Sequence, residues 1–434
     1  MDQSADLLTK GRSSPLLDAL DERIAAHAEE AFTFLERLIA ADSTVGREQS
    51  ALEIVASELD GLGFEIERLS IPEAIADVPG AGVPLLPYDG RYDVIGRRAG
   101  DIEGTSVLLN GHIDVVPAEE PRLWTSPPFE PDRRDGWLFG RGAGDMKCGF
   151  AMGVLALRAL LDPAVDAELG PLTFVAAIEE EYTGNGTLAS VEAGVLADIA
   201  VLLEPTSLDL LVGGVGILWL EITVEGLAAH AEAAGGATNA MLAARPIIDS
   251  LAELERSLNA VGDPRIETAE PLHVNLGTVQ AGDWTSSVPS IARLGIRVGY
   301  PPTWTVSQAE SHVREHIAKV AAGDPWLKDH PPAVRQSGFR ALGYGLPVDH
   351  PLTLALAESH RDAHGTEPRA IAMATTTDAR TYLDRAGIPA ICYGPHTARI
   401  HGIDEAVEMT SIVEGARTLA RFLLAVPHRR GIAG

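Results

Sequence analysis

The chain has 434 residues, of which 46% are hydrophobic, and this is enough to bury a large core in two or three domains. It carries 34 lysines and arginines against 62 aspartates and glutamates, so its formal net charge is −28. Because this charge repels phosphate groups over a long range, we exclude nucleic acids and anionic membranes as main partners.

Residues 1–30 contain no apolar signal core, and no later stretch is long and uncharged enough to cross a membrane. The two cysteines, Cys148 and Cys392, are too few for a disulfide framework and fit a reducing compartment. We therefore expect a cytoplasmic protein, in which the glycosylation sequon at Asn185 would not be used.

The first half of the chain predicts an α/β domain. Two amphipathic helices are expected over residues 16–39 and 48–62, followed by an irregular segment rich in proline and glycine. Three nearly continuous apolar strands and one apolar helix come next, the strands at residues 107–109, 172–178 and 199–204 and the helix at 146–161. Such strands are typical of a mixed, mostly parallel sheet that helices sandwich on both faces.

The pattern changes after Pro205. Strands at residues 217–226, 273–282 and 292–300 alternate in polarity, and helices are expected at 239–258 and 307–322. This order indicates an inserted α+β module over residues 212–326. The larger domain then consists of residues 1–211 and 327–434, and its last helix is expected at 405–424.

Five side chains of metal-ligand type stand at the ends of apolar runs. They are His112, Asp145, Glu181, Glu204 and His401. Each one alone has an ordinary explanation, such as a helix cap or a hydrogen-bonded core histidine. Together they fall where strands of the predicted sheet end, and open α/β sheets place their sites at that edge. Two imidazoles and three carboxylates are suitable ligands for divalent metals.

Two short motifs support this hypothesis. Asp114 follows His112 by two residues, so its carboxylate can hold the far nitrogen of the imidazole, although a turn aspartate beside a backbone-bonded histidine is the alternative. Glu179, Glu180 and Glu181 are adjacent, and a pair of metal ions would offset their repulsion. The turn residues that follow would let Glu180 and Glu181 face the same site, whereas a solvated acidic loop is the alternative.

Several blocks of sequence resemble the co-catalytic zinc amidohydrolases, a family that includes acetylornithine deacetylase, succinyl-diaminopimelate desuccinylase, aminoacylase and glutamate carboxypeptidase. The blocks are NGHIDVVP, DGWLFGRGAGDMKCG, AAIEEEYTGNGT, LLEPT and RIHGIDE. The resemblance implies a catalytic domain of zinc-peptidase type with a ferredoxin-like lid or dimerisation domain. It also implies two Zn²⁺ ions, which Co²⁺ or Mn²⁺ could replace, and a homodimer.

The resemblance also assigns roles. The five residues above would be the metal ligands, with Asp145 bridging, and Glu180 would be the general base supported by Asp114; a shift of one residue in the alignment would move the base to Glu179. His230 would reach the active site of a neighbouring subunit and polarise the scissile carbonyl. Arg297 would bind a substrate carboxylate, and Asn239 would be a further substrate-binding residue. Arg380 is a candidate specificity residue, with surface ion pairs or hydrogen bonds as the alternative.

We therefore expect hydrolysis of a linear amide bond in a small N-acyl substrate, with acetylornithine deacetylase as the nearest likeness. Deformylation of an N-formyl aminopyrimidine, desuccinylation and aminoacylase activity are alternatives within the family. A catalytically silent binding relative is the alternative from another class, and it is disfavoured because no ligand and no base is missing. The rival metal motif HxxEH, formed by His312, Glu315 and His316, is better explained by a solvated helix of the inserted module.

Overall fold

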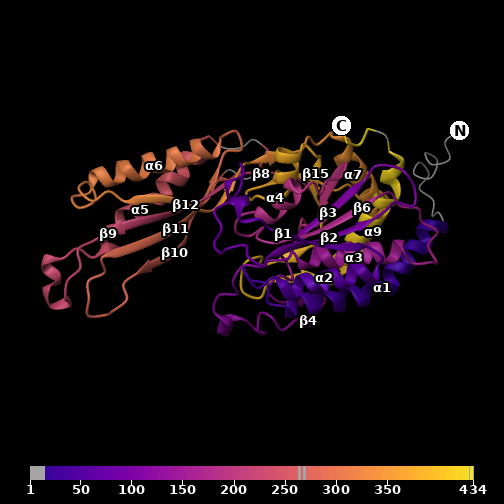
Figure 1. Ribbon diagram of the computed structural model, residues 1–434, viewed down its shortest axis with the longest axis horizontal. Helices are drawn as coiled ribbons and strands as arrows, with labels where there is room; N and C mark the ends of the chain where they lie inside the picture. The colour runs from indigo at the N-terminus through magenta and orange to yellow at the C-terminus, as the bar shows by residue number, and fades with distance from the viewer. Residues whose placement is uncertain (1–14, 262–264, 267–269, 430, 434) are drawn as a thin grey trace.

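The computed structural model describes residues 15–261, 265–266, 270–429 and 431–433. Within these ranges no helix is both long and apolar enough to cross a lipid bilayer. The first fourteen residues of the expected segment 1–211 lie outside the description. The chain forms two domains, and the smaller one projects from one end of the larger one (Figure 1).

The larger domain is built on a nine-stranded sheet with the order β1-β2-β6-β3-β7-β15-β8-β13, in which β14 also pairs with β8. Pairing is parallel among β6, β3, β7 and β15 at the centre. It is antiparallel between β1 and β2, β2 and β6, β15 and β8, and β8 and β13, whereas β14 pairs with β8 in parallel. The expected mixed sheet is confirmed. Its strands are β1 (Glu65–Ser70), β2 (Tyr92–Arg98), β3 (Val107–His112), β6 (Leu172–Ala177), β7 (Ile199–Leu202), β8 (Leu210–Gly214), β13 (Tyr344–Gly345), β14 (Ala370–Met373) and β15 (Ala390–Cys392).

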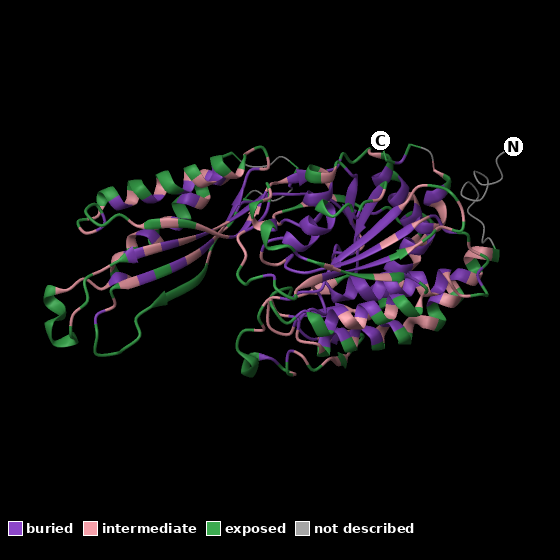
Figure 2. Cartoon of the chain, in the orientation of Figure 1, coloured by how far each residue is buried: buried purple, intermediate pink, exposed green. Residues whose placement is uncertain are grey.

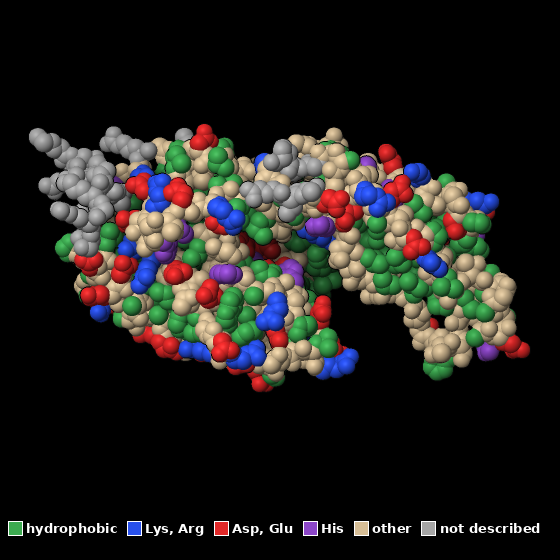
Figure 3. Space-filling view, turned by 180° about the vertical axis from the view of Figure 1, so that it is seen from behind, with side chains coloured by type: hydrophobic (Ala, Val, Ile, Leu, Met, Phe, Trp, Pro, Cys, Tyr) green, Lys and Arg blue, Asp and Glu red, His purple; other side chains and the backbone are tan. Residues whose placement is uncertain are grey.

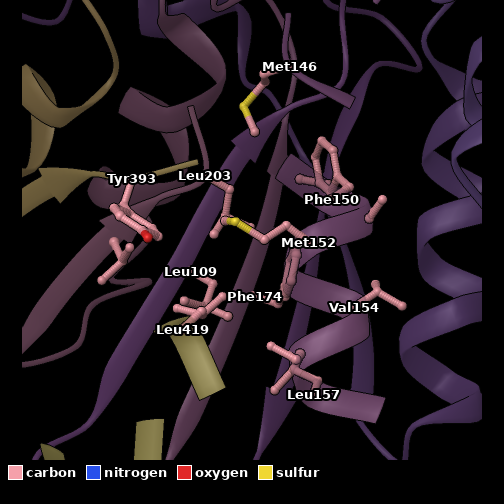
Figure 4. Close-up of a cluster of buried hydrophobic side chains, with 14 of the residues drawn as sticks. Leu109, Met146, Phe150, Met152, Val154, Leu157, Phe174, Leu203, Tyr393 and Leu419 are labelled. Atoms are coloured by element: carbon pink, nitrogen blue, oxygen red, sulfur yellow. The ribbon is translucent and has the colours of Figure 1, made fainter. Parts of the chain in front are cut away.

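Helices cover both faces of this sheet because its side chains alternate between two apolar cores. Leu109 and Phe174 belong to the core under one set of helices, whereas their strand neighbours Leu108 and Val175 belong to the core on the opposite face. Figure 4 shows the first of these cores, where Phe150, Met152 and Leu157 of one helix pack against the strands. The helices are α1 (Pro15–Ala40), α2 (Gln49–Gly61), α3 (Lys147–Leu160), α4 (Asn185–Glu192), α7 (Pro351–His364), α8 (Ala379–Thr381) and α9 (Met409–Ala425).

The smaller domain is a four-stranded antiparallel sheet of order β10-β11-β9-β12, packed against two helices. Its elements are β9 (Gly216–Glu225), α5 (Ala240–Asn259), β10 (Val274–Ala281), β11 (Ile291–Tyr300), α6 (Val306–Gly323) and β12 (Ala333–Ala341). The succession βαββαβ with this strand order is the ferredoxin-like arrangement. Figure 2 shows that its helices and central strands bury one side, while β10 is largely exposed.

The boundaries of the smaller domain differ from the expected 212–326. Strand β8 stays in the larger sheet to Gly214, and β12 adds a fourth strand to the smaller sheet as far as Ala341. The sequence of β12, AVRQSGFRA, contains a glycine and two arginines where alternation would be needed, and its pairing with β9 is irregular between Gln336 and Arg340. The residues of β12 therefore lack the alternating pattern that predicts a strand.

A third, small sheet of order β16-β17-β5-β4 lies in the larger domain. Its strands are β4 (Asp132–Arg134), β5 (Trp137–Phe139), β16 (Thr397–Ala398) and β17 (Ala406–Glu408). It pairs the segment before α3 with the segment before α9, which are far apart in the sequence. The last helix therefore begins at Met409, later than expected, because residues 406–408 are used as a strand.

Candidate metal centre

Of the five residues of metal-ligand type, three lie at the ends of strands of the large sheet and two lie in loops. His112 is the last residue of β3, Glu204 follows β7, and Glu181 follows β6, so these three stand at the carboxyl ends of neighbouring parallel strands. Asp145 lies in the turn between β5 and α3, and His401 lies between β16 and β17. The structure brings all five together, and Figure 3 shows acidic and histidine side chains near the hollow between the two domains.

Asp145 is at the middle of this cluster. Its Oδ1 is 3.1 Å from Nε2 of His112, and its Oδ2 is 3.4 Å from Nε2 of His401. His112 is in turn 4.0 Å from Oε2 of Glu204, and His401 is 2.9 Å from Oε1 of Glu181. One atom each of His112, Asp145 and Glu181 lies within 4.8 Å of the others. The carboxylate of Asp145 thus presents one oxygen to each of two half-sites.

Asp114 supports the cluster in a way that differs from the expectation. Nδ1 of His112 is 2.9 Å from the backbone oxygen of Asp114, whereas the carboxylate is 3.7 Å away. The carboxylate instead accepts hydrogen bonds from the backbone N–H groups of Glu180 and Glu181, both at 3.1 Å. The backbone therefore fixes the imidazole, and the side chain of Asp114 fixes the loop that carries the two glutamates.

Glu179 points away from its two neighbours. Its side chain is fully buried, accepts hydrogen bonds from Tyr88 at 2.7 Å and Thr183 at 2.8 Å, and forms an ion pair with Arg91. Its φ of +61° lies in the left-handed region, and its carbonyl accepts the N–H of Gly184 at 2.7 Å. The predicted turn is thus present, and it separates Glu179 from the site that Glu180 and Glu181 face.

The acidic groups are crowded. Burial raises the pKa of Glu204 and of Asp114 to about 8 each, and it raises the pKa of Glu180 well above its usual range. The charge of Glu181 raises the pKa of His401 to about 11. Four carboxylates, those of Asp145, Glu180, Glu181 and Glu204, face two imidazoles, and this mixed N and O donor set fits divalent zinc, cobalt or manganese.

Sequence reasoning missed Arg141 and Glu405, which lie behind Asp145. Glu405 is fully buried, and its Oε1 accepts the backbone N–H groups of Gly144 and Asp145, both at 2.8 Å. Its other carboxylate oxygen pairs with Arg141, of which 1% is exposed. Both residues lie inside motifs quoted above, GRGAGD and HGIDE, but nothing in the sequence indicated that they would meet.

Comparison with known proteins identifies the family of this chain. Residues 108–425 match the model of the peptidase family M20/M25/M40. The chain belongs to this family. The expected zinc amidohydrolase resemblance is therefore confirmed, and the chain is a hydrolase that acts on amide bonds, as the M20 relatives are.

Two relatives cover nearly the whole M20 chain. The N-formyl-4-amino-5-aminomethyl-2-methylpyrimidine deformylase of Bacillus subtilis (strain 168) is 27% identical over 432 residues, which are 94% of this chain and 97% of that protein. The succinyl-diaminopimelate desuccinylase of Nitrosomonas eutropha (strain DSM 101675 / C91 / Nm57) is 27% identical over 408 residues, which are 90% and 98% of the two chains.

Solved structures confirm the fold of this M20 chain. Human carnosine dipeptidase 1 matches with a TM-score of 0.78 at 18% identity, over 96% of this chain and 100% of that chain. The dipeptidase Dug1p of Saccharomyces cerevisiae matches with a TM-score of 0.79 at 15% identity, over 95% and 99% of the two chains. At such low identities these likenesses concern the fold alone.

The structure places Arg380 and Arg297 near the boundary between the domains of the M20 chain. Arg380 donates to the carbonyl of Thr377 at 2.8 Å and lies 3.5 Å from Oδ1 of Asp378 and 3.9 Å from Oε1 of Glu180. Because Arg380 is buried, these contacts are internal and a surface ion pair is wrong. Arg297 donates to the carbonyl of Ala374 at 3.2 Å, and burial lowers its pKa. No carboxylate within the described ranges forms an ion pair with Arg297.

His230 and Asn239 do not join the cluster. His230 is exposed at the start of the 3₁₀ helix Ala231–Gly236, which follows β9 at the end of the smaller domain away from the larger one (Figure 1). The side chain of Asn239 caps α5 by accepting the N–H groups of Met241 at 3.0 Å and Leu242 at 3.3 Å. In this chain Asn239 therefore has a structural role.

The rival motif HxxEH is a helix-packing feature. Nε2 of His312 is 2.8 Å from the hydroxyl of Ser257, and Nε2 of His316 is 3.0 Å from the hydroxyl of Ser250. Both serines belong to α5, while Glu315 is exposed on α6. The two histidines thus bind the neighbouring helix of the smaller domain, so they are less solvated than expected, and they do not converge on a metal site.

Proposed function

We propose that this chain is a deacylase that hydrolyses a linear amide bond of a small N-acyl substrate with the help of two divalent cations, preferably Zn²⁺. The observation that carries the proposal is the position of Asp145, whose two oxygens face two different imidazoles. His112 and Glu204 would hold one cation, His401 and Glu181 would hold the other, and Asp145 would lie between them. Co²⁺ or Mn²⁺ would suit the same donors.

When bound, the cations would lower the pKa of a water molecule and polarise the amide carbonyl. Glu180 would be the general base, and its Oε2 is 4.0 Å from Nε2 of His112. Glu180 takes a proton from the attacking water and gives it to the leaving amine. Asp114 holds the backbone of Glu180 in place, and the guanidinium of Arg380 lies 3.9 Å from its Oε1.

Two groups outside the metal centre would recognise the substrate. Arg297 is a partly buried guanidinium that has no carboxylate partner within the described ranges, so a substrate carboxylate would give it one. His230 would come from a second copy of the chain in a homodimer and would stabilise the negative charge that develops on the carbonyl oxygen. Location in the cytoplasm stays a prediction.

The finer part of the proposal concerns which acyl group the enzyme removes. The relatives named above are a deformylase of an aminopyrimidine and a desuccinylase, and neither is an acetylornithine deacetylase. The N-formyl aminopyrimidine, N-succinyl-diaminopimelate and N-acetylornithine are therefore the three substrates to test first. The N-formyl aminopyrimidine has no carboxylate for Arg297, so activity on it that is unchanged in Arg297→Gln would separate it from the other two.

The test of the proposal is turnover of this panel by the enzyme reconstituted with Zn²⁺ or Co²⁺. We expect Glu180→Gln to lower kcat by about 10²–10⁴-fold because the proton carrier is lost. Binding of the metal should persist, since Glu180 is not among the five proposed ligands. Full activity of Glu180→Gln would refute the mechanism, and substrate binding without any turnover by the wild type would favour the silent relative.

A further inference from the structure

Two of the five residues in the metal centre do not stand on the large sheet. Asp145 and His401 lie in loops at the edge of the small sheet, in which β17 pairs with β5 in the register Ala406 to Phe139 and Glu408 to Trp137. His112 is itself in β3, Glu204 stands two residues after β7, and Glu181, which follows β6, donates its N–H to the side chain of Asp114 close behind β3. The positions of Asp145 and His401 therefore depend on contacts between loops more than the other positions do.

The buried pair of Arg141 and Glu405 supplies these contacts. Oε1 of Glu405 accepts the N–H groups of Gly144 and Asp145, and its backbone carbonyl accepts the N–H of Gly140 at 3.0 Å. Nη2 of Arg141 lies 3.4 Å from the backbone oxygen of His401 and 3.4 Å from that of Pro117. The pair thus touches the backbone of both loops that carry the proposed ligands.

The ion pair of Arg141 and Glu405 is shielded from water. Arg141 and Glu405 have almost no exposed surface, and the ring of Trp124 lies over the guanidinium with 5.2 Å between the ring centroid and Cζ. Within such a setting the removal of one partner leaves a buried charge without compensation, so the remaining groups rearrange. The backbone of Asp145 would move first, because Glu405 accepts its N–H directly.

We propose that Arg141 and Glu405 are positioning residues that set the affinity for the cation held by His401, Glu181 and Asp145. The cation at His112 and Glu204 depends on them less, because its other supports belong to the large sheet. This inference rests on the proposed two-cation function. It assigns to the small sheet the task of completing the second half-site.

The experiment measures cation binding directly. Apo enzyme is titrated with Zn²⁺ and Co²⁺ by calorimetry, and the bound metal is counted by elemental analysis after gel filtration. We expect two equivalents for the wild type. For Glu405→Gln and Arg141→Lys we expect one tight equivalent and a second one weakened by about 10–100-fold. Excess Co²⁺ should restore much of the activity of both variants, since neither residue takes part in the reaction.

The control is Arg421→Lys, which alters another buried guanidinium, paired with Asp21 and Asp362 and remote from the metal centre. It should lose thermal stability without losing the second cation. Arg141→Lys keeps its charge and so remains informative should Glu405→Gln fail to fold. Two equivalents at wild-type affinity in a folded Arg141→Lys, or equal loss of the second cation in the control, would overturn the inference. Fewer than two equivalents in the wild type would instead refute the two-cation function.

Discussion

The environment of single residues decides which of the many acidic and histidine side chains can serve the site. Glu179 and Glu180 are adjacent, yet Glu179 is neutralised by Arg91 in the interior, whereas Glu180 faces His112. A left-handed φ at Glu179 produces this difference. The buried His360 and the half-buried His364 form another pair, with ring centroids 4.6 Å apart, but both use ring nitrogens for hydrogen bonds, His360 to Tyr393 and His364 to Thr418.

At the residue scale, His360 should make the protein sensitive to acid. Burial and the neighbouring His364 lower its pKa from 6.5 to about 4, while Asp209 and Glu367 oppose the shift, and burial also lowers the pKa of His364. Between these two pKa values His360 is protonated in the unfolded chain but not in the folded chain. The free energy of unfolding therefore decreases as the pH falls from about 6.5 to 4. We expect a smaller loss of Tm over this interval in His360→Asn than in the wild type, with chelator present in both. Equal losses would count against this explanation.

At the scale of elements, aromatic side chains join the two domains beside Glu180. Tyr182, which directly follows Glu181, contacts Trp219 of β9 edge-to-face at 5.2 Å, and Trp219 contacts Phe339 of β12 at 5.5 Å. The guanidinium of Arg380 lies 5.3 Å from the centroid of Phe339. Arg297 is opposite Trp219 in the pairing of β11 with β9. The smaller domain therefore contacts Tyr182, which stands two residues after the base, and Arg380, which lies 3.9 Å from the carboxylate of the base. It also carries the candidate carboxylate-binding residue on β11, the strand next to Trp219.

Removal of the Trp219 side chain should consequently affect the reaction through the contact between the two domains. We expect Trp219→Ala to lower kcat and raise KM together, with kcat/KM reduced by about tenfold or more, because the position of the smaller domain becomes less defined. Trp219→Phe keeps an aromatic ring and should retain most of the activity. Kinetics at saturating metal, with thermal unfolding as a check of folding, measure this effect. Unchanged kcat/KM in Trp219→Ala would show that the contact has no catalytic consequence.

The sequence predicted the proposed metal ligands better than it predicted the residues that hold them in place. Strand ends could be read from apolar runs, and the motifs named the five clustered residues and the turn after Glu179. The contacts between Arg141 and Glu405, and those of Glu179 with Tyr88 and Arg91, join segments whose meeting depends on the whole fold. Asn239 was assigned to substrate by likeness, whereas its local role as a helix cap could have been read from its position before α5.

At the scale of the whole molecule, the distance between His230 and the metal centre suggests a role between subunits. If His230 serves a second copy, an inactive Glu180→Gln chain can still lend its histidine to a His230→Ala chain. Equal mixing after dissociation and reassociation should then restore about a quarter of the wild-type activity, because half the dimers are mixed and each has one complete site. Light scattering checks that dimers form. Mixtures no more active than the separate variants would exclude this role.

The place where the smaller domain enters the larger sheet has an evolutionary consequence. The chain leaves the sheet at Gly214 and returns at Tyr344, and these two residues are paired across β8 and β13. Since the exit and the return are hydrogen-bonded neighbours, a tight turn could replace residues 216–341 without changing the path of any other strand. A single insertion or deletion at this position would thus be enough to add, exchange or remove the smaller domain, while the strands that carry the metal centre are inherited unchanged.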